Sequence, residues 1–164
     1  MNNAKIKSWM VTATAMAAAA MLTLSGCGSG AESKADADEA TFTAAGLLPL
    51  TGSMAYLGPA NIATMKLAQN DINAAGGVLG KDVTEVEADT SDGEHADQNT
   101  SAAQSVLSKH PSVVIGPAAS GVVKNVYKSI VAEKIPVISM ASTSMTLSGM
   151  DPYFFRTVAP DAVQ

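Results

Sequence analysis

Cysteine is almost absent from this sequence. Cys27 is the only one among 164 residues, so no disulfide within the chain can stabilise the fold. Tryptophan also occurs once, at Trp9. The two histidines, His95 and His110, lie far apart and have no cysteine or carboxylate at metal-ligand spacing. We therefore interpret both as surface histidines and predict neither a metal site nor a cofactor.

Basic residues are outnumbered by acidic ones. The chain has 10 Lys and Arg against 15 Asp and Glu, a formal net charge of −5. Lys5 and Lys7 precede an apolar segment, and their removal with a signal peptide would leave 8 basic residues and a net charge near −7. Such a charge argues against nucleic acid or an anionic surface as the partner.

Several catalytic motifs are missing as well. No G-x-G-x-x-G follows the first predicted strand, and neither G-x-x-x-x-G-K-[ST] nor G-x-S-x-G occurs. No histidine falls at a strand end where it could pair with a nucleophilic serine. Asp89 and Asp92 are close in sequence, but helix capping and loop solvation account for them. We predict no catalytic residues.

The amino-terminal segment has the form of a secretory signal peptide. The basic start MNNAKIK precedes an uncharged run from Trp9 to Leu24, which is short for a bilayer span. Leu24-Ser25-Gly26-Cys27 resembles the lipobox of bacterial lipoproteins, in which the cysteine thiol receives a diacylglyceryl group and the chain is cut just before it. We predict a lipoprotein signal peptide at residues 1–26 and lipidation of Cys27, which is favoured over a lone buried thiol.

The next segment, residues 27–40, is predicted to be the lipidated Cys27 and a flexible tether. GSGAESKADADEA is small, polar and acidic, and lacks the apolar residues that offset ordering entropy. The folded part is predicted at residues 41–164, a length sufficient for one core.

Apolar runs alternate with helical patterns along the folded part. Helices are predicted from Pro59 to Gly76, from the capping box Ser91–Glu94 to His110, from Ser120 onward, and again from Asp161. This alternation predicts an α/β fold, a doubly wound parallel sheet. Strands are predicted at residues 45–50, 82–89, 113–115, 136–139 and 153–158.

Helical spacing also predicts which residues face the core. The predicted inward positions are Ile62, Met65, Gln69, Ile72 and Ala75 in the first helix, Ala96, Thr100, Ala103 and Leu107 in the second, and Val122, Val123, Val126 and Ile130 in the third.

Open parallel sheets bind ligands at the carboxyl ends of their strands. This rule selects four loops, at Thr51–Gly58, Thr90–Gly93, Gly116–Ser120 and Met140–Ser144.

Three of these loops carry candidate binding groups. Ser120 and the free N–H groups of the first helical turn could bind an anion, or Ser120 could only cap its helix. Ala141 offers a carbonyl and Thr143 an N–H and a hydroxyl, which together suit the two charged groups of an amino acid, although an ordinary Ser/Thr turn has the same residues. Tyr56 could cover an apolar ligand or pack on the first helix.

The sequence from Leu47, LLPLTGSMAYLGPANIATMKLAQNDINAAGGVLGKDV, resembles the opening of type I periplasmic binding proteins that serve branched-chain amino acid ABC transporters. EADTSD, IGPAASG, PVISMASTS and YFFRTVAPDAVQ extend the resemblance to residues 45–164. It implies that the hydroxyls of Ser120 and Thr143 bind a ligand α-carboxylate and that the carbonyl of Ala141 accepts from its α-ammonium. Tyr56 would lie at the cleft mouth, and Ser142 could add a backbone contact.

The resemblance implies a lipid-anchored extracytoplasmic receptor that captures a small-molecule ligand, a branched-chain amino acid or a similar small carboxylate or amide, for the permease subunits of an ABC importer. A sensor that uses the same lobe for signalling is the alternative, and an α/β enzyme is a third hypothesis. Members of the family have two lobes, so the chain is expected to be the incomplete amino-terminal lobe, with the second lobe missing, from either a fragment or a truncated gene.

Overall fold

The computed structural model describes residues 41–163. The predicted signal peptide (residues 1–26) and the predicted lipidation site and tether (residues 27–40) lie outside the described residues. Within residues 41–163, none of the helices combines the length and the hydropathy needed to span a bilayer.

The centre of the fold is a sheet of five strands, all of them parallel. The first strand, β1 (Thr43–Leu48), lies between β2 (Thr84–Asp89) and β3 (Val113–Ile115). Next to β3 come β4 (Val137–Ser139) and β5 (Phe154–Arg156), in the order β2-β1-β3-β4-β5. All five predicted strands are confirmed, although β1 begins two residues earlier than the apolar run suggested.

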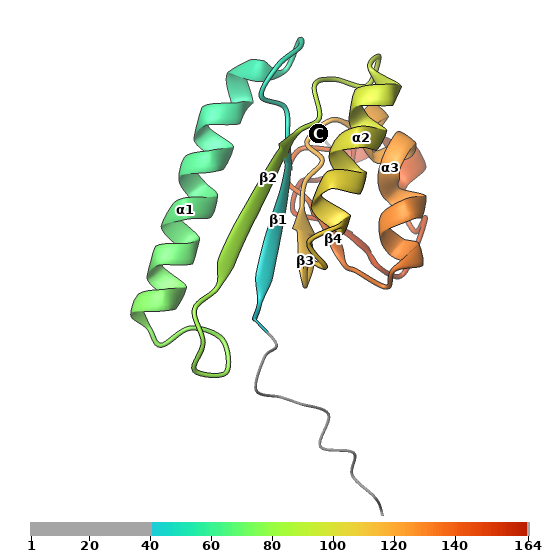
Figure 1. Ribbon diagram of the computed structural model, residues 1–164. Coiled ribbons are helices and arrows are strands. Elements are labelled where there is room, and N and C mark those ends of the chain that lie inside the picture. The colour runs from blue at the N-terminus through green and yellow to red at the C-terminus, as the bar shows by residue number, and fades with distance from the viewer. Residues whose placement is uncertain (1–40, 164) are drawn as a thin grey trace, which may run out of the picture. The chain divides into compact units, whose positions relative to one another are not determined.

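Helices cover both faces of the sheet, which confirms the doubly wound α/β fold. One face carries α1 (Gly58–Ala74), and the other carries α2 (Ala96–Leu107) and α3 (Ser120–Ala132) (Figure 1). Pro59 stands in the first turn of α1, where its missing N–H costs no hydrogen bond. Short 3-10 turns follow β1, β4 and β5, at Ala55–Leu57, Met145–Leu147 and Asp161–Val163.

The main core lies between the sheet and the α2–α3 layer. Side chains alternate along each strand, so Ala45 and Leu47 of β1 face these helices and are fully buried. The predicted inward face of α3 is confirmed, because Val122, Val123, Val126 and Ile130 are all buried. The sheet and this helix layer therefore pack through aliphatic side chains contributed by β1, β3, β4, α2 and α3.

The predicted inner face of α2 is only partly confirmed: Ala103 is buried and Leu107 packs against the core, but Ala96 and Thr100 do not face it. Thr100 and Ala96 are exposed, and the buried positions of this helix are Asn99, Ala102, Ala103 and Val106. The pattern misled because Asn99 looks like a surface residue. Its buried amide instead donates to the carbonyls of Thr90 and Asp92 in the loop after β2, and buried polar groups are normally hydrogen-bonded in this way.

The predicted capping box at Ser91–Glu94 is also wrong. Ser91 has a φ of 53°, in the left-handed region, and α2 begins only at Ala96. The carboxylate of Asp92 accepts the N–H of Glu94 in its place, at 3.2 Å.

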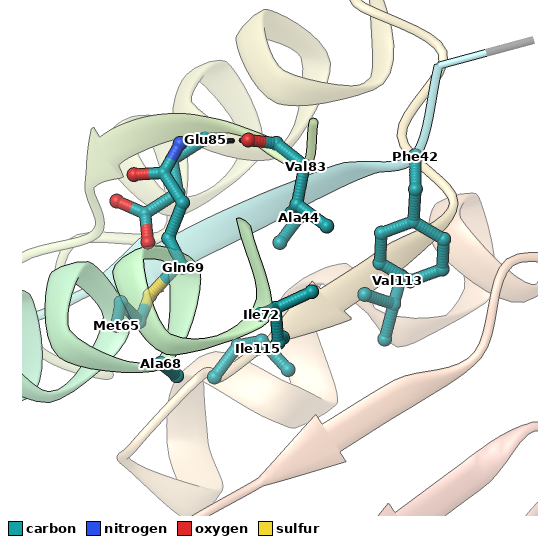
Figure 2. A pocket seen from close by; sticks show the side chains of 10 residues that line it. All are labelled: Phe42, Ala44, Met65, Ala68, Gln69, Ile72, Val83, Glu85, Val113 and Ile115. Carbon is teal, nitrogen blue, oxygen red and sulfur yellow. Dashed lines mark hydrogen bonds between the residues drawn. The ribbon is translucent and has the colours of Figure 1, made fainter. Parts of the chain in front are cut away.

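A cavity of about 160 Å³ lies between α1 and the sheet (Figure 2). Its lining is mostly apolar, with Met65 and Ile72 from α1 facing Ala44 and Ile115 of the sheet. Burial raises the pKa of Glu85, which stands at its wall beside Glu87. Of the predicted inward face of α1, only Met65 is buried, and Ile72 is 40% exposed.

The substitution Leu47→Ala should destabilise the lobe by about 2–5 kcal/mol, because it leaves a cavity in the core under α2 and α3. Leu79→Ala is the matched control, since Leu79 is 94% exposed and its truncation should change stability by less than about 0.5 kcal/mol. Urea unfolding followed by circular dichroism measures both. Equal effects of the two substitutions would contradict the assigned core.

Candidate functional site

The four loops selected from the sequence lie at one edge of the sheet, because every strand is parallel and each loop follows a strand's carboxyl end. Hydrogen bonds join these loops in series. The first pair is joined by two carboxylates, and the last pair is joined by serine hydroxyls.

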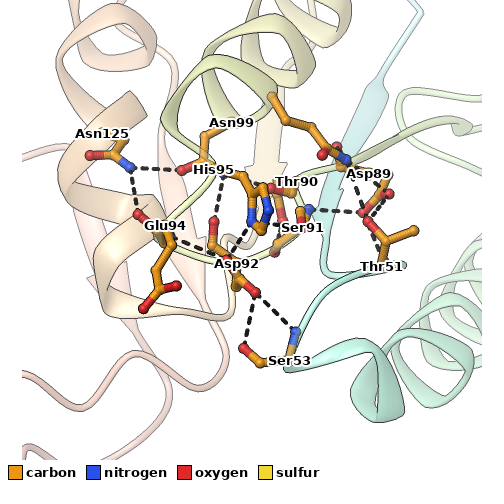
Figure 3. Close-up of polar contacts among 12 residues, drawn as sticks. Thr51, Ser53, Asp89, Thr90, Ser91, Asp92, Glu94, His95, Asn99 and Asn125 are labelled. Carbon is orange, nitrogen blue, oxygen red and sulfur yellow. Dashed lines mark hydrogen bonds and ion pairs between the residues drawn. The ribbon is translucent and has the colours of Figure 1, made fainter.

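Asp89, the last residue of β2, holds the loop after β1 (Figure 3). Its Oδ1 accepts the backbone N–H groups of Leu50 at 2.9 Å and of Thr51 at 3.1 Å. Its Oδ2 accepts the Thr51 hydroxyl at 2.6 Å and the Gln98 side-chain amide at 3.1 Å. One side chain therefore fixes the direction in which the chain leaves β1.

Asp92 makes the second link between the same two loops (Figure 3). Its Oδ2 accepts the N–H of Ser53 at 2.9 Å and the Ser53 hydroxyl at 3.1 Å. Its Oδ1 lies 2.7 Å from Nδ1 of His95. Gly52, with a φ of 77°, passes so close that an added Cβ would lie 2.6 Å from the Asp92 carboxylate, which explains glycine at this position.

These hydrogen bonds favour the ionised form of both carboxyls. The pKa of Asp92 lies well below its ordinary value, chiefly because of the Ser53 N–H and then because of His95. For Asp89, partial burial opposes ionisation, but the hydrogen bonds from Thr51, Ser91 and Leu50 together outweigh it and lower the pKa.

The loop after β2 also contacts the start of α3. The Asn125 amide donates to the Gly93 carbonyl at 3.3 Å and to Oδ1 of Asn99 at 2.7 Å. Gly93 and Gly121 approach so closely that a Cβ on either would lie within 3.0 Å of the other's Cα. The first turn of α3 is thereby held against the loop after β2.

Serine hydroxyls connect the loops after β3 and β4. Ser139, at the end of β4, donates to the Pro117 carbonyl at 2.6 Å. The fully buried Ser142 donates to the same carbonyl and to that of Ala118. Ser120 accepts the N–H of Ser144 at 3.2 Å, so Ser120 lies against the segment that contains Thr143.

Ser120 does not cap α3. The helix begins at Ser120 itself, with Ala119 in the capping position and no side chain bonded to the first turn. The cap interpretation is therefore wrong, and the Ser120 oxygen instead accepts a hydrogen bond from the loop after β4. Within residues 41–163, the N–H groups of Ser120, Gly121 and Val122 have no hydrogen-bond acceptor, as expected at a helix start.

The predicted residues of the loop after β4 differ in how their polar groups are used. Ser142 is fully engaged, because its N–H donates to Ser139 and its carbonyl accepts from Arg156. By contrast, the carbonyl of Ala141 and the N–H and hydroxyl of Thr143 make no hydrogen bond within the described part of the chain. Unpaired donors and an unpaired acceptor thus lie beside the open first turn of α3.

Tyr56 lies in the 3-10 turn after β1, and its side chain is 75% exposed. The turn is attached to the loop clamped by Asp89 and Asp92, and it leads directly into α1. The ring of Tyr56 is therefore free to contact a ligand beside these loops.

Sequence reasoning missed the importance of Asp89 and Asp92, which it attributed to capping and solvation. The available signal was an acidic residue at the very end of a strand, beside the Gly and Ser loop of the neighbouring strand. The described residues hold no group of three His, Cys, Asp or Glu side chains that could share a metal ion. The arrangement suits a small ligand with an anionic end and an ammonium group.

Comparison with protein families gives one match: residues 41–164 match the sequence model of a family described as periplasmic binding protein. No curated protein matches the chain. The match confirms the resemblance seen in the sequence, and it concerns a family of binding proteins rather than enzymes.

Solved structures of ABC transporter binding proteins are also similar to this chain. The branched-chain amino acid substrate-binding protein LivJ of Streptococcus pneumoniae, solved with isoleucine, is 27% identical over 75% of this chain, with a TM-score of 0.69. A branched-chain amino acid ABC transporter protein of Rhodospirillum rubrum is 27% identical over 74%, with a TM-score of 0.67. A Desulfitobacterium hafniense protein solved with Leu shares the fold, at 22% identity over 74% and a TM-score of 0.63. The chain spans about 35% of each of these three proteins.

The lowered pKa of Asp92 generates a pH prediction. A carboxyl whose pKa is lower in the folded state stabilises the fold above its unfolded pKa, near 3.8, and this contribution is lost as the pH falls through the folded value. Asp92→Asn should therefore be less stable than wild type at pH 7, and the difference should shrink below pH 3.8.

Urea unfolding at a series of pH values measures this difference, with Asp82→Asn as the matched control because Asp82 is exposed and lies outside the four loops. A stability difference for Asp92→Asn that stays constant across the acid range would contradict the role of its ionised form.

Proposed function

The chain belongs to the periplasmic binding protein family, and from this premise we propose that it is the ligand-binding lobe of a lipid-anchored extracytoplasmic receptor. The receptor captures an amino acid, of branched-chain or similar type, and delivers it to the permease subunits of an ABC importer. The lobe binds its ligand without covalent chemistry.

One observation carries the proposal. At the carboxyl edge of the sheet, unpaired N–H groups of the first turn of α3 lie beside the unpaired N–H and hydroxyl of Thr143 and the unpaired carbonyl of Ala141. Ala141 and Thr143 are only partly buried, so a ligand can reach these groups. A ligand with a carboxylate and an ammonium would satisfy both the donors and the acceptor.

The proposed role of each site residue follows from which of its polar atoms has no partner within the described lobe and can bind the ligand. Thr143 donates its N–H and hydroxyl to the ligand carboxylate. The Ser120 oxygen already accepts from Ser144, so its hydroxyl proton can be donated to the same carboxylate. The carbonyl of Ala141 accepts from the ammonium, Tyr56 covers the apolar part of the ligand, and Ser142 supports the loop from inside.

The ligand class is supported by chemistry and by the relatives. A helix start favours a negative group because of its free N–H groups and its dipole. Isoleucine and Leu are the ligands named in two of the related structures. Because the chain spans about 35% of those proteins, further residues of a full-length receptor would complete the pocket, and the lobe alone is expected to bind weakly.

The lipid anchor is supported by the sequence alone. Leu24-Ser25-Gly26-Cys27 ends an apolar signal segment, and the acidic tether separates it from the first described residue. Export is supported by the family description, which is that of periplasmic proteins. A tethered receptor would stay near the permease.

Substitutions Ser120→Ala and Thr143→Ala should each raise the dissociation constant for leucine or isoleucine by roughly 10–100-fold, because each removes a hydrogen bond to a charged group. Isothermal titration calorimetry of the mature full-length gene product measures the effect. Thr100→Ala is the matched control, since Thr100 is exposed on α2 and its hydroxyl bonds only within the helix. Unchanged affinity in both site variants, or no binding of any amino acid by the wild type, would overturn the proposal.

Substitution Cys27→Ser should abolish lipid attachment, because a hydroxyl does not replace the thiol in the alkylation. In the native host, labelled palmitate should no longer enter the protein, and the protein should leave the membrane fraction. Ser29→Ala, two residues farther along, is the control and should keep both label and location. Palmitate labelling of the Cys27→Ser protein would disprove the anchor.

A further inference from the structure

Arg156, at the end of β5, is bonded entirely to neutral oxygens of the neighbouring loop. Its Nη1 donates to the carbonyl of Ser142 at 3.3 Å and to that of Ser144 at 3.0 Å. Its Nη2 donates to the hydroxyl of Ser148. The two carbonyls stand on either side of Thr143, the residue whose N–H and hydroxyl are unpaired.

The geometry points to Arg156 as a positioning residue that aims the Thr143 N–H at the ligand carboxylate. This inference rests on the proposed function and adds to it a residue that does not touch the ligand. The planarity of two successive peptide bonds fixes the direction of this N–H.

The peptide bond between Ser142 and Thr143 is the first. In a trans peptide the C=O and the N–H point in opposite directions. Arg156 binds the Ser142 carbonyl, so the N–H of Thr143 in the same plane points away from Arg156. That N–H is one of the donors without a partner in the described residues.

The peptide bond between Thr143 and Ser144 is the second, and both of its polar groups have partners that lie on opposite sides. The N–H of Asp161 holds the Thr143 carbonyl at 2.9 Å. On the opposite side of this plane, the Ser144 N–H donates to Ser120 at 3.2 Å. Arg156 and Asp161 therefore hold the carbonyls of two adjacent peptide planes. The Ser144 N–H faces Ser120 at the start of α3, and the Thr143 N–H points away from Arg156.

Arginine suits this position better than lysine. The planar guanidinium has several N–H donors in fixed directions and binds the two carbonyls and the Ser148 hydroxyl at once. The single ammonium of lysine keeps the charge but cannot keep the same directions. Removal of the guanidinium would free the Ser142–Thr143 plane to rotate.

The test compares leucine with leucinamide, which lacks the carboxylate charge, on the mature full-length gene product. Arg156→Met should raise the dissociation constant for leucine roughly tenfold or more and change that for leucinamide much less. Arg156→Lys should give a smaller loss. Ser148→Ala is the matched control, because it removes the third contact of the guanidinium and leaves both carbonyl contacts.

Two further measurements separate positioning from general destabilisation. A double-mutant cycle of Arg156→Met with Thr143→Ala should be non-additive if both residues act on one carboxylate. Amide hydrogen exchange, measured by NMR without ligand, should show faster exchange at Ser144 in Arg156→Met than in Ser148→Ala.

The outcomes are distinct. Wild type that binds no amino acid overturns the proposed function and, with it, the ligand role of Arg156. Two results would overturn this inference alone if the wild type binds leucine. In the first, Arg156→Met binds leucine as tightly as the wild type does. In the second, Arg156→Met loses as much affinity for leucinamide as for leucine. Folding of each variant is checked by its thermal unfolding midpoint, and Arg156→Lys serves if Arg156→Met does not fold.

Discussion

Parallel pairing of the five strands is the constraint on which the rest of the structure depends. It gathers the loops that follow β1, β2, β3 and β4 at one edge, although they are far apart in sequence. In such sheets this edge is the natural ligand site, because helix starts and strand ends meet there. Each loop brings few polar groups, and only their convergence produces the set of unpaired groups that is proposed to bind a small zwitterion.

The convergence is made rigid by hydrogen bonds that cross from loop to loop. Asp89 and Asp92 fix the first loop against the second, Asn125 connects the second to α3, and Ser120 and Ser142 join the third to the fourth. A pocket that is organised before its ligand arrives loses less entropy on binding. The polar groups that this network leaves unpaired are therefore the ones available to bind a ligand.

Sequence patterns predicted the fold well because the strands are short apolar runs and the helices have clear boundaries such as Pro59 and Gly76. They failed where tertiary contacts override local preference. Ser120 has the residue type of a cap but bonds to Ser144 instead, and Asn99 looks exposed but is buried. The roles of Asp89 and Arg156 were not predicted, because their partners lie on other strands' loops. For Asp89 the sequence signal was its place at the end of a strand, and for Arg156 no local pattern indicates the role.

The strand order also has a consequence for how the chain folds. Thr43, at the start of the interior strand β1, bonds Thr84 and Ser112, which follow it by 41 and 69 residues. Closing such long loops costs chain entropy before apolar contacts compensate for it, so pairing of this kind is slow. Until residue 115 has been synthesised, β1 therefore has at least one unpaired edge next to apolar side chains, and unpaired edges associate with other chains. The topology that assembles the proposed binding edge also exposes the newly made chain to association with other chains until β3 is available.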